Sequence, residues 1–405
     1  MASSGVVIVG AGHAGGSAAA FLRLAGYTNP ITLVGEGKEL PYLRPPLSKG
    51  FLTGSTQAEH LLLKTEEFYS SNSITLRLGS ACVAVDPAAK FITLADGTQL
   101  AYDKLVLACG STPSRIPVLN ARNTHVLASL HDAVRLKNRL KARNRLFVVG
   151  GGYVGLEAAA TARIAGLHVT VVEQQERILA RVASPVIAAH ISEMHRQHGN
   201  DIRTGVSVTQ AERSDVDTIT TVELSDGTRL EVDDILVGIG ATPALTFARH
   251  AGLVCNAGID VDENCRTSDP DIFAIGDMTR RPLSDGRQMR LESVQNALEQ
   301  ARRVAAELTG HPLPTPETPW FWSDQFGAKL QIAGVKKPGL RTVRRFFPDK
   351  ERLSVLHLLE GRLICAETVN AAQDFMAARH IIGQCLSIDE KKAVDPDIPL
   401  KSCII

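Results

Sequence analysis

The 405-residue sequence contains no apolar run approaching the roughly 18 residues that a membrane-spanning helix needs. It has no excess of one charge either, since 44 basic residues are balanced by 43 acidic ones. The net charge of +1 therefore creates no global field that would draw the chain to nucleic acid or to a membrane. The first strand pattern begins almost at the N-terminus, which we interpret as leaving no room for a signal peptide. These absences favour a soluble, cytoplasmic protein.

The seven cysteines show no CxxC pair and no spacing typical of metal ligands. An odd, scattered set of this kind fits reduced thiols in a cytosol, and it predicts no metal site. Too few residues follow Cys403 for a prenylation box. No cysteine lies between residues 1 and 81.

One pattern occurs twice. The apolar run 6–9 leads into Gly10-Ala11-Gly12-His13-Ala14-Gly15, and the run 146–149 leads into Gly150-Gly151-Gly152-Tyr153-Val154-Gly155. An alanine-rich helical segment follows each run, and then a β-branched strand that ends on an acid, Glu36 or Glu173. A single GxGxxG can be merely a glycine-rich turn, but two copies in the same strand–turn–helix–strand–acid frame argue against that interpretation. The sequence therefore predicts two dinucleotide-binding βαβ units.

Phosphate geometry explains these residue types. The first glycine allows the tight turn from strand to helix, and the second lets the backbone approach a pyrophosphate. The third lets helix and strand pack closely, with the pyrophosphate at the positive helix N-terminus. The acid that ends the second strand accepts hydrogen bonds from two ribose hydroxyls.

The remaining pattern predicts an α/β protein with two Rossmann-like dinucleotide-binding domains and a small α+β C-terminal domain. Hairpins are expected at Asp96-Gly97 and Asp226-Gly227. Helices are expected over 131–145, around 184–198 and over 292–309, and a proline-rich linker over 312–319. We place the first dinucleotide-binding domain at 1–114 and 243–316, the second at 115–242 and the C-terminal domain at 317–405.

Local chemistry leaves three features open. The prolines of segment 40–49 predict either a rigid surface connection or a support that holds Ser48 and Lys49 against a ligand. The Gly276-Asp277 pair fits a ligand-binding carboxylate at the end of a strand, or simply a capped turn. The basic residues of 131–145 are more typical of a solvated helix face than of a docking patch.

Several motifs together resemble the FAD- and NADH-dependent ferredoxin reductases of the putidaredoxin-reductase type. The motifs are Gly10–Gly15 with Glu36, Arg44-Pro45-Pro46-Leu47-Ser48-Lys49, Gly150–Gly155 with Glu157, Gly276-Asp277, Leu291-Glu292-Ser293-Val294-Gln295-Asn296-Ala297 and Pro319-Trp320-Phe321-Trp322-Ser323-Asp324-Gln325. The likeness covers essentially the whole chain.

The resemblance implies that the first unit holds the ADP half of FAD and the second holds NADH. It assigns catalytic roles to Lys49, beside the flavin ring and paired with Glu157, and to Tyr153, where nicotinamide stacks. Without the family, Glu157 reads more simply as a carboxylate favoured by a helix dipole. The implied cofactor contacts are Gly10, Gly12, His13, Ala14, Gly15, Glu36, Arg44, Lys49, Cys82, Ala108, Gly276, Asp277, Glu292, Ser293, Val294, Trp322, Gly150, Gly152, Tyr153, Val154, Glu173 and Gly240.

The resemblance also implies the reaction. Hydride passes from NADH to FAD, and electrons then leave one at a time for a [2Fe–2S] ferredoxin that serves a P450 or an aromatic-ring oxygenase. The carboxylate of Glu173 favours the free ribose hydroxyls of NADH and repels the extra phosphate of NADPH. We also expect ferredoxin to dock on basic side chains, above all Arg302 and Arg303, and less strongly on Lys336, Lys337, Arg344 and Arg345. The family's members suggest a monomer or a weak homodimer.

Two positions depart from the family pattern. Ala128 stands where an arginine is common, so one FAD contact is replaced or lost. Cys109 stands where threonine is usual.

Three other functions compete with this interpretation. A disulfide reductase shares both dinucleotide units but needs a redox cysteine after the first, where this chain has none. A redox signalling protein resembling apoptosis-inducing factor would predict a strongly basic surface or a targeting segment. A rubredoxin reductase is harder to separate, because both partners are acidic one-electron carriers.

Overall fold

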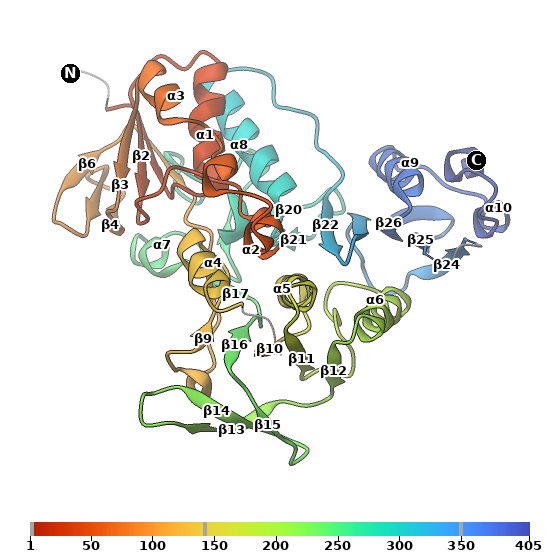
Figure 1. Ribbon diagram of the computed structural model, residues 1–405. Helices are drawn as coiled ribbons and strands as arrows, with labels where there is room; N and C mark the ends of the chain where they lie inside the picture. The colour runs from red at the N-terminus through yellow and green to blue at the C-terminus, as the bar shows by residue number, and fades with distance from the viewer. Residues whose placement is uncertain (1–3, 141–143, 348–350) are drawn as a thin grey trace. The chain divides into compact units, whose positions relative to one another are not determined.

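The computed structural model describes residues 4–140, 144–347 and 351–405 (Figure 1). The chain divides into two compact units. Unit 1 comprises Met1–Arg44, Ala58–Thr112 and Ala241–Glu317, and unit 2 comprises Pro45–Gln57, Pro113–Gly240 and Thr318–Ile405. The predicted NADH-binding and C-terminal segments thus lie in one compact unit, and the predicted three-domain boundaries stay a prediction.

Unit 1 is built on a five-stranded sheet of order β19-β7-β1-β2-β3. Its strands are β1 (Val6–Val9), β2 (Ile31–Gly35), β3 (Ile74–Leu78), β7 (Lys104–Leu107) and β19 (Ile272–Ala274), and every neighbouring pair is parallel. Helices α1 (His13–Leu24) and α8 (Val294–Thr309) lie side by side in Figure 1. Alanines of both helices belong to the core that contains the apolar strands, and small residues dominate α1.

Shorter elements complete unit 1. They are η2 (Ala58–Leu61), α3 (Glu66–Ser71), β4 (Cys82–Asp86), β5 (Phe91–Leu94), β6 (Gln99–Ala101), α7 (Thr246–His250), β18 (Ile259–Asp260), η4 (Gly276–Met278), β20 (Thr279–Pro282) and β21 (Gln288–Met289). A two-stranded sheet pairs β8 (Ser111–Pro113) with β17 (Ala241–Pro243). The hairpin predicted at Asp96-Gly97 is confirmed as the turn between β5 and β6.

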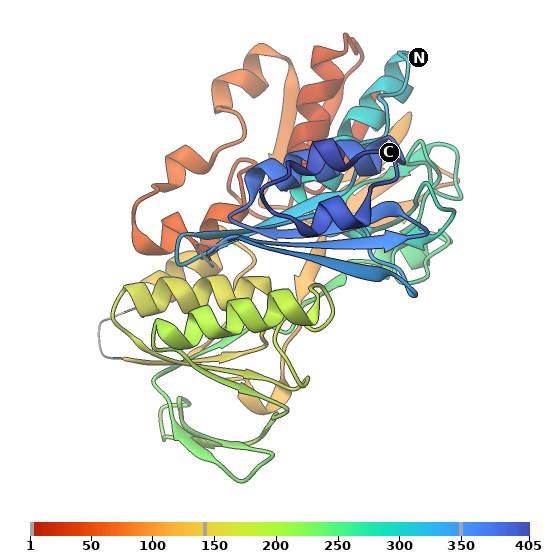
Figure 2. The same ribbon diagram turned by 90° about the vertical axis from the view of Figure 1, so that its right-hand side faces the viewer.

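Unit 2 repeats the parallel sheet, in the order β12-β11-β10-β16-β9. The strands are β9 (Thr124–His125), β10 (Arg145–Val149), β11 (His168–Glu173), β12 (Asp201–Thr204) and β16 (Asp234–Val237). Helices α5 (Tyr153–Ile164) and α6 (Pro185–Gln197) lie over one face of this sheet (Figure 2). The hairpin at Asp226-Gly227 is confirmed within β13 (Val208–Arg213), β14 (Ile219–Leu224) and β15 (Arg229–Glu231).

The C-terminal part of unit 2 is an antiparallel sheet of order β22-β23-β26-β25-β24. Its strands are β22 (Trp320–Gln325), β23 (Ala328–Gly334), β24 (Arg341–Phe346), β25 (Leu353–Leu359) and β26 (Arg362–Val369). Helices α9 (Ala372–Gly383) and α10 (Glu390–Val394) cover one face (Figure 2), and η5 (Leu400–Cys403) closes the chain. The prediction of an α/β protein with an α+β C-terminal part is confirmed.

The long basic helix predicted over 131–145 is wrong. Helix α4 spans only Leu130–Lys137 and ends at Asn138, and Arg145 already begins strand β10. There its guanidinium forms ion pairs with Asp233, at 2.9 Å, and with Glu231. The contacts that Arg145 makes in the strand therefore outweigh its helix propensity. Lys141 and Arg143, also part of the predicted basic run, lie outside the described residues.

Residues 45–57 form a short proline-initiated segment of unit 2. It consists of η1 (Pro45–Ser48) and α2 (Gly50–Thr53). The hydroxyl of Thr161 in α5 donates to the backbone carbonyl of Ser48 at 2.9 Å, which attaches the segment to that helix. The segment thus holds Ser48 and Lys49 against helix α5 of the same unit, and both interpretations of its prolines stay predictions.

Candidate functional site

The first glycine loop has the geometry that a pyrophosphate needs. Gly10 has φ +114°, and a Cβ there would lie 2.3 Å from the carbonyl oxygen of Ala108. A Cβ on Gly15 would lie 1.9 Å from the Gly10 oxygen. At Gly12, by contrast, a Cβ would meet only the Arg44 guanidinium, at 3.6 Å. The loop is therefore closed on its protein side and open where a phosphate would approach, with a cation facing that opening.

Among the described residues, helix α1 starts at this loop without a side-chain cap, and its first turn carries no acid. Its free N–H groups and positive end are thus available to an anion. The ring of His13 is buried, and its Nδ1 has no partner among the described residues. Burial, helped by the Arg44 charge, lowers the pKa of His13 and keeps it neutral. These features fit the pyrophosphate of a dinucleotide.

Asp277 is brought to the same loop by the end of β19. Gly276 has φ +78°, and a Cβ there would lie 3.1 Å from the Ala14 Cβ, so the two predicted motifs touch. Burial, with the Glu292 charge, raises the pKa of Asp277 to about 6 although the side chain keeps some exposure. Such a raised value is typical of a carboxyl in a ligand cleft.

The other predicted FAD contacts of unit 1 have simpler surroundings. Glu36 is exposed immediately after β2, and Glu292 pairs with Arg290. Ser293 caps helix α8 by accepting the Asn296 N–H at 3.1 Å, and Val294 is the first residue of that helix. Burial raises the pKa of the Cys82 thiol to about 11.

Cys109, the departure from the usual threonine, lies just after β7 in unit 1. Its backbone N–H donates to the Met278 sulfur at 3.1 Å. Burial raises the pKa of its thiol to about 12. A thiol with so high a pKa carries almost no thiolate at neutral pH, so Cys109 is not a reactive cysteine.

The second glycine loop reproduces the first within unit 2. Gly150 has φ +105°, and a Cβ there would lie 2.5 Å from the Gly238 oxygen. A Cβ on Gly155 would lie 2.4 Å from the Gly150 oxygen, whereas the nearest atom to one on Gly152 is 3.8 Å away. In the described residues of α5, no side chain caps its N-terminus. The three glycine positions therefore have the same steric role in both loops.

Glu173, at the end of β11, is held across this loop. One carboxylate oxygen accepts the Gly151 N–H at 2.8 Å, and the other accepts the Gln175 N–H at 2.8 Å. The carboxylate is thus fixed where an adenosine ribose would lie on a dinucleotide bound to the loop. Of the other predicted positions, Val154 is exposed and Gly240 has φ +103°.

Tyr153 begins helix α5 and packs on Phe321 of β22, with ring centroids 4.4 Å apart. Its hydroxyl is buried without a partner among the described residues, and burial raises its pKa. The ring thus stands as a neutral aromatic surface beside the second glycine loop. Trp322 is the next residue along β22 and packs against Trp320, with ring centroids 5.4 Å apart.

The predicted Lys49–Glu157 pair is present in unit 2. Lys49 Nζ lies 2.9 Å from Glu157 Oε1, and the Glu157 side chain is only 6% exposed. Two hydroxyls join it: Ser48 donates to Glu157 Oε2 at 2.5 Å, and Ser323 donates to Oε1 at 2.6 Å. Three donors from two segments, 45–57 and β22, therefore hold one buried carboxylate, as a buried charge requires.

Sequence reasoning missed both hydroxyls as partners of Glu157. For Ser48, the two interpretations left open were a rigid surface connection and a side chain held against a ligand; its hydroxyl donates to the Glu157 carboxylate. Ser323 lies in a motif that the sequence singles out, but its role depends on a contact across 166 positions of chain. No local signal predicts such a contact.

The docking prediction is wrong for Arg303. This side chain is buried and pairs with Glu299 at 3.1 Å. Arg302 remains partly exposed, with an ion pair to Glu317 at 3.3 Å. Arg345, for which docking was predicted less strongly, is also buried, and its Nε lies 2.8 Å from Asp374 Oδ2. Burial removes both Arg303 and Arg345 from any docking surface.

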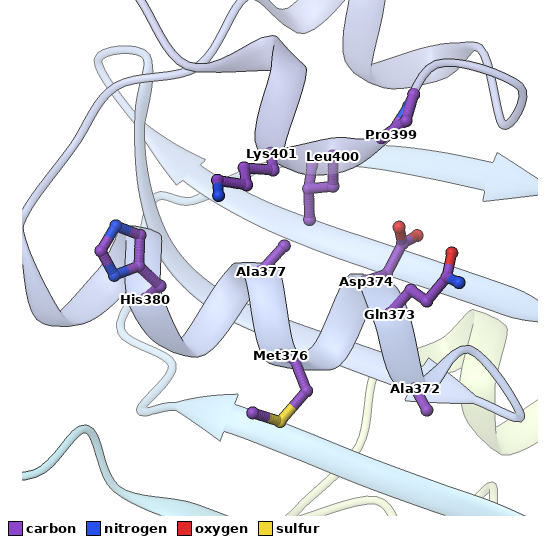
Figure 3. A pocket seen from close by; sticks show the side chains of 9 residues that line it. All are labelled: Ala372, Gln373, Asp374, Met376, Ala377, His380, Pro399, Leu400 and Lys401. Carbon is purple, nitrogen blue, oxygen red and sulfur yellow. The ribbon is translucent and has the colours of Figure 1, made fainter.

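A hollow of about 590 Å³ lies in the C-terminal part of unit 2 (Figure 3). Its lining includes Met376, His380 and Lys401 around helix α9 and η5. None of the residues predicted to bind a cofactor lines it. Within residues 4–140, 144–347 and 351–405, no helix is both long and apolar enough to cross a membrane.

The two glycine loops, each at the carboxyl edge of a parallel sheet, define a protein with two dinucleotide-binding units. The chain belongs to the pyridine nucleotide-disulphide oxidoreductase family, whose model matches residues 4–301, and residues 320–404 match the reductase C-terminal family. Terpredoxin reductase from a Pseudomonas species is 42% identical, over 98% of this chain and 97% of its own length. Putidaredoxin reductase, solved in covalent complex with putidaredoxin, superposes with a TM-score of 0.97 at 40% identity, covering 100% of this chain and 98% of that one.

These findings confirm the resemblance to the putidaredoxin-reductase type. A rubredoxin–NAD(+) reductase from Pseudomonas putida is 38% identical, over 90% of this chain and 95% of its own length.

Proposed function

We propose that the chain is an FAD-dependent NADH:ferredoxin reductase that delivers electrons one at a time to a [2Fe–2S] ferredoxin serving a P450 or an aromatic-ring oxygenase. The observation that carries the proposal is the presence of two separately built glycine loops of matching geometry. The full-length likeness to a reductase solved with its iron–sulfur partner supports the identity of the acceptor.

In this proposal, unit 1 binds FAD and unit 2 binds NADH. Loop 10–15 binds the FAD pyrophosphate, Glu36 the ribose, and Asp277 the ribityl chain. Loop 150–155 and Glu173 bind NADH in the corresponding way. The open faces of Gly12 and Gly152 and the uncapped ends of α1 and α5 fit these roles.

Several side chains prepare the chemistry. FAD, when bound, supplies the conversion between two-electron hydride transfer and single-electron transfer. The family likeness assigns the flavin-ring contacts to Lys49, Val294 and Trp322. Glu157 holds the Lys49 ammonium group in place at 2.9 Å, and Tyr153 presents an aromatic face to nicotinamide.

The test is NADH-driven cytochrome c reduction by the purified protein, with and without a [2Fe–2S] ferredoxin. We expect strong stimulation by the ferredoxin. Flavin reduction without stimulation, followed by stimulation with rubredoxin, would support the second candidate, which the rubredoxin–NAD(+) reductase relative favours. Absence of flavin reduction by NADH would overturn the proposal and favour a signalling role.

For the partner surface, we propose docking at Arg302, whose side chain is 45% exposed. Arg302→Ala should raise the KM for ferredoxin about three- to tenfold at low salt and flatten its dependence on salt. The matched control is Arg135→Ala, which removes an exposed arginine of α4 in unit 2. Equal salt dependence in all three proteins would remove Arg302 from the docking surface.

We further propose a cytoplasmic monomer or weak homodimer. The support for the cytoplasm is a set of seven free cysteines, which fits a reducing compartment. Sedimentation velocity over a range of concentrations tests the assembly state, and a tight dimer at the lowest concentration would contradict it.

A further inference from the structure

A line of buried polar side chains runs from Glu157 to helix α6, entirely within unit 2. Ser323 donates to Glu157 Oε1 at 2.6 Å, and Gln325 Nε2 donates to the Ser323 hydroxyl at 3.0 Å. Gln325 Oε1 lies 2.8 Å from His195 Nε2, and His195 Nδ1 lies 2.9 Å from Asn200 Nδ2. All five side chains are buried, with 0% exposure for His195 and 2% for Gln325.

The charge at one end sets the direction of every hydrogen bond in this line. Glu157 Oε1 accepts from the Lys49 ammonium group at 2.9 Å, and the Ser323 hydroxyl donates to the same oxygen at 2.6 Å. Ser323 then accepts from the Gln325 amide nitrogen, which leaves the amide oxygen facing His195. That oxygen requires a proton on His195 Nε2.

The far end of the line fits the same tautomer. With Nε2 protonated, His195 Nδ1 is an acceptor, and the Asn200 amide nitrogen donates to it at 2.9 Å. A second proton on the ring would place two donors against each other at Nδ1. Burial lowers the pKa of His195 to about 4, so the ring stays neutral at working pH.

We propose that His195 is a positioning residue for flavin reduction: through Gln325 and Ser323 it holds the Glu157 carboxylate in the orientation that fixes Lys49. The ring has one donor and one acceptor at fixed angles, and Phe326 packs edge-on against it at 5.0 Å. The His195 ring therefore prevents the Gln325 side-chain amide from rotating by 180°. Without it, Gln325 can present its oxygen to Ser323, and the Ser323 hydroxyl then donates to Gln325 instead of to Glu157.

The link from Glu157 to the flavin rests on the proposed function, but the tautomer of His195 does not. The first experiment is therefore ¹⁵N NMR of the holoenzyme labelled at histidine, with His195→Phe used for assignment. We expect the neutral tautomer with Nε2 protonated at pH 7. An Nδ1-protonated or doubly protonated ring would overturn the proposed direction, whatever the flavin does.

The second experiment is a double-mutant cycle on the rate of flavin reduction by NADH in stopped flow. His195→Phe should lower that rate about tenfold without changing the dissociation constant for NADH, because it acts on Lys49 and not on nucleotide binding. Ser323→Ala should lower the rate at least as much. Adding His195→Phe to Ser323→Ala should not lower the rate further, because Ser323→Ala already breaks the hydrogen-bonded line between His195 and Glu157.

Two further variants test whether packing alone explains the loss. His195→Gln keeps a donor near the Nε2 position and should stay within about twofold of the wild type. His198→Phe is the matched control, since His198 stacks on Phe326 at 3.9 Å while its Nδ1 bonds to the Met194 carbonyl of α6 and not to a residue of the line. If His195→Phe does not fold, Gln325→Leu cuts the same line.

The outcomes separate the two proposals. Additive losses in the cycle, or no rescue by His195→Gln, would make His195 a packing residue and overturn the inference. If Lys49→Met leaves flavin reduction unchanged, the assignment of Lys49 in the proposed function fails instead. A rate loss that vanishes in the Ser323→Ala background supports the inference.

Discussion

Replacing Glu173 by glutamine should weaken the enzyme's preference for NADH over NADPH. The carboxylate is held by the N–H groups of Gly151 and Gln175, at 2.8 Å each, so it cannot swing away from an extra phosphate on the ribose. Two unit charges about 4 Å apart repel by about 4 kcal/mol at an effective dielectric constant of about 20. Because Glu173 is only partly buried, we take about half of that value, which corresponds to roughly 30-fold in kcat/KM.

The Glu173→Gln variant should therefore gain about 30-fold in kcat/KM for NADPH. It should also lose up to about tenfold for NADH, because one backbone N–H of the loop loses its acceptor and the ribose loses a charged one. Steady-state ferricyanide reduction with each nucleotide measures both constants, and Glu176→Gln, at an exposed acid three residues further on, is the control. An unchanged NADPH/NADH ratio in Glu173→Gln, or equal constants in the wild type, would refute the reasoning.

Other perturbations should act on single features. Gly15→Ala places a Cβ 1.9 Å from the Gly10 oxygen and should abolish FAD retention, seen as loss of flavin absorbance after gel filtration. Lys49→Met should lower the rate of flavin reduction at least tenfold while FAD stays bound, since it removes the cation but none of the ADP contacts; an unchanged rate contradicts the role. For Glu367, burial alone would raise the pKa, but the His357 hydrogen bond and the Lys336 charge lower it to about 2. This carboxylate thus contributes stability above pH 4.5, up to about 3 kcal/mol, which is lost as the pH falls from about 4.5 to 2. In urea titrations, the stability difference from Glu367→Gln should shrink below pH 4.5, and a constant difference would show that the linkage is absent.

Local steric rules made both glycine loops predictable from the sequence. Gly10 and Gly150 need a positive φ and the close approach of a neighbouring strand, and Gly15 and Gly155 need contact with the loop itself. These requirements act over a few residues and leave a spacing that can be read directly. The parallel sheets followed from the same pattern, because each apolar run is buried on both faces.

Contacts between distant segments were not predictable. The Ser48 and Ser323 hydroxyls meet Glu157 across 109 and 166 positions of chain, and a serine in a proline-rich or aromatic segment carries no mark of such a partner. The burial of Arg303 did have a local signal, since Glu299 stands four residues earlier on the same helix. A charge pair at that spacing accounts for an arginine without any external partner.

The surroundings of Glu157 also decide between the helix dipole and the ion pair as the reason for its position. Glu157 is the fifth residue of α5, beyond the turn where the dipole acts most strongly, and its carboxylate is bound by side chains from other segments. A buried ion pair is weak evidence for stability, because apolar residues of similar volume in its place are often as stable. Stability alone therefore does not explain why three donors converge on this carboxylate. Holding the Lys49 ammonium in one place does explain it, because a lysine on a flexible stem keeps a fixed position only when its partner is itself immobile.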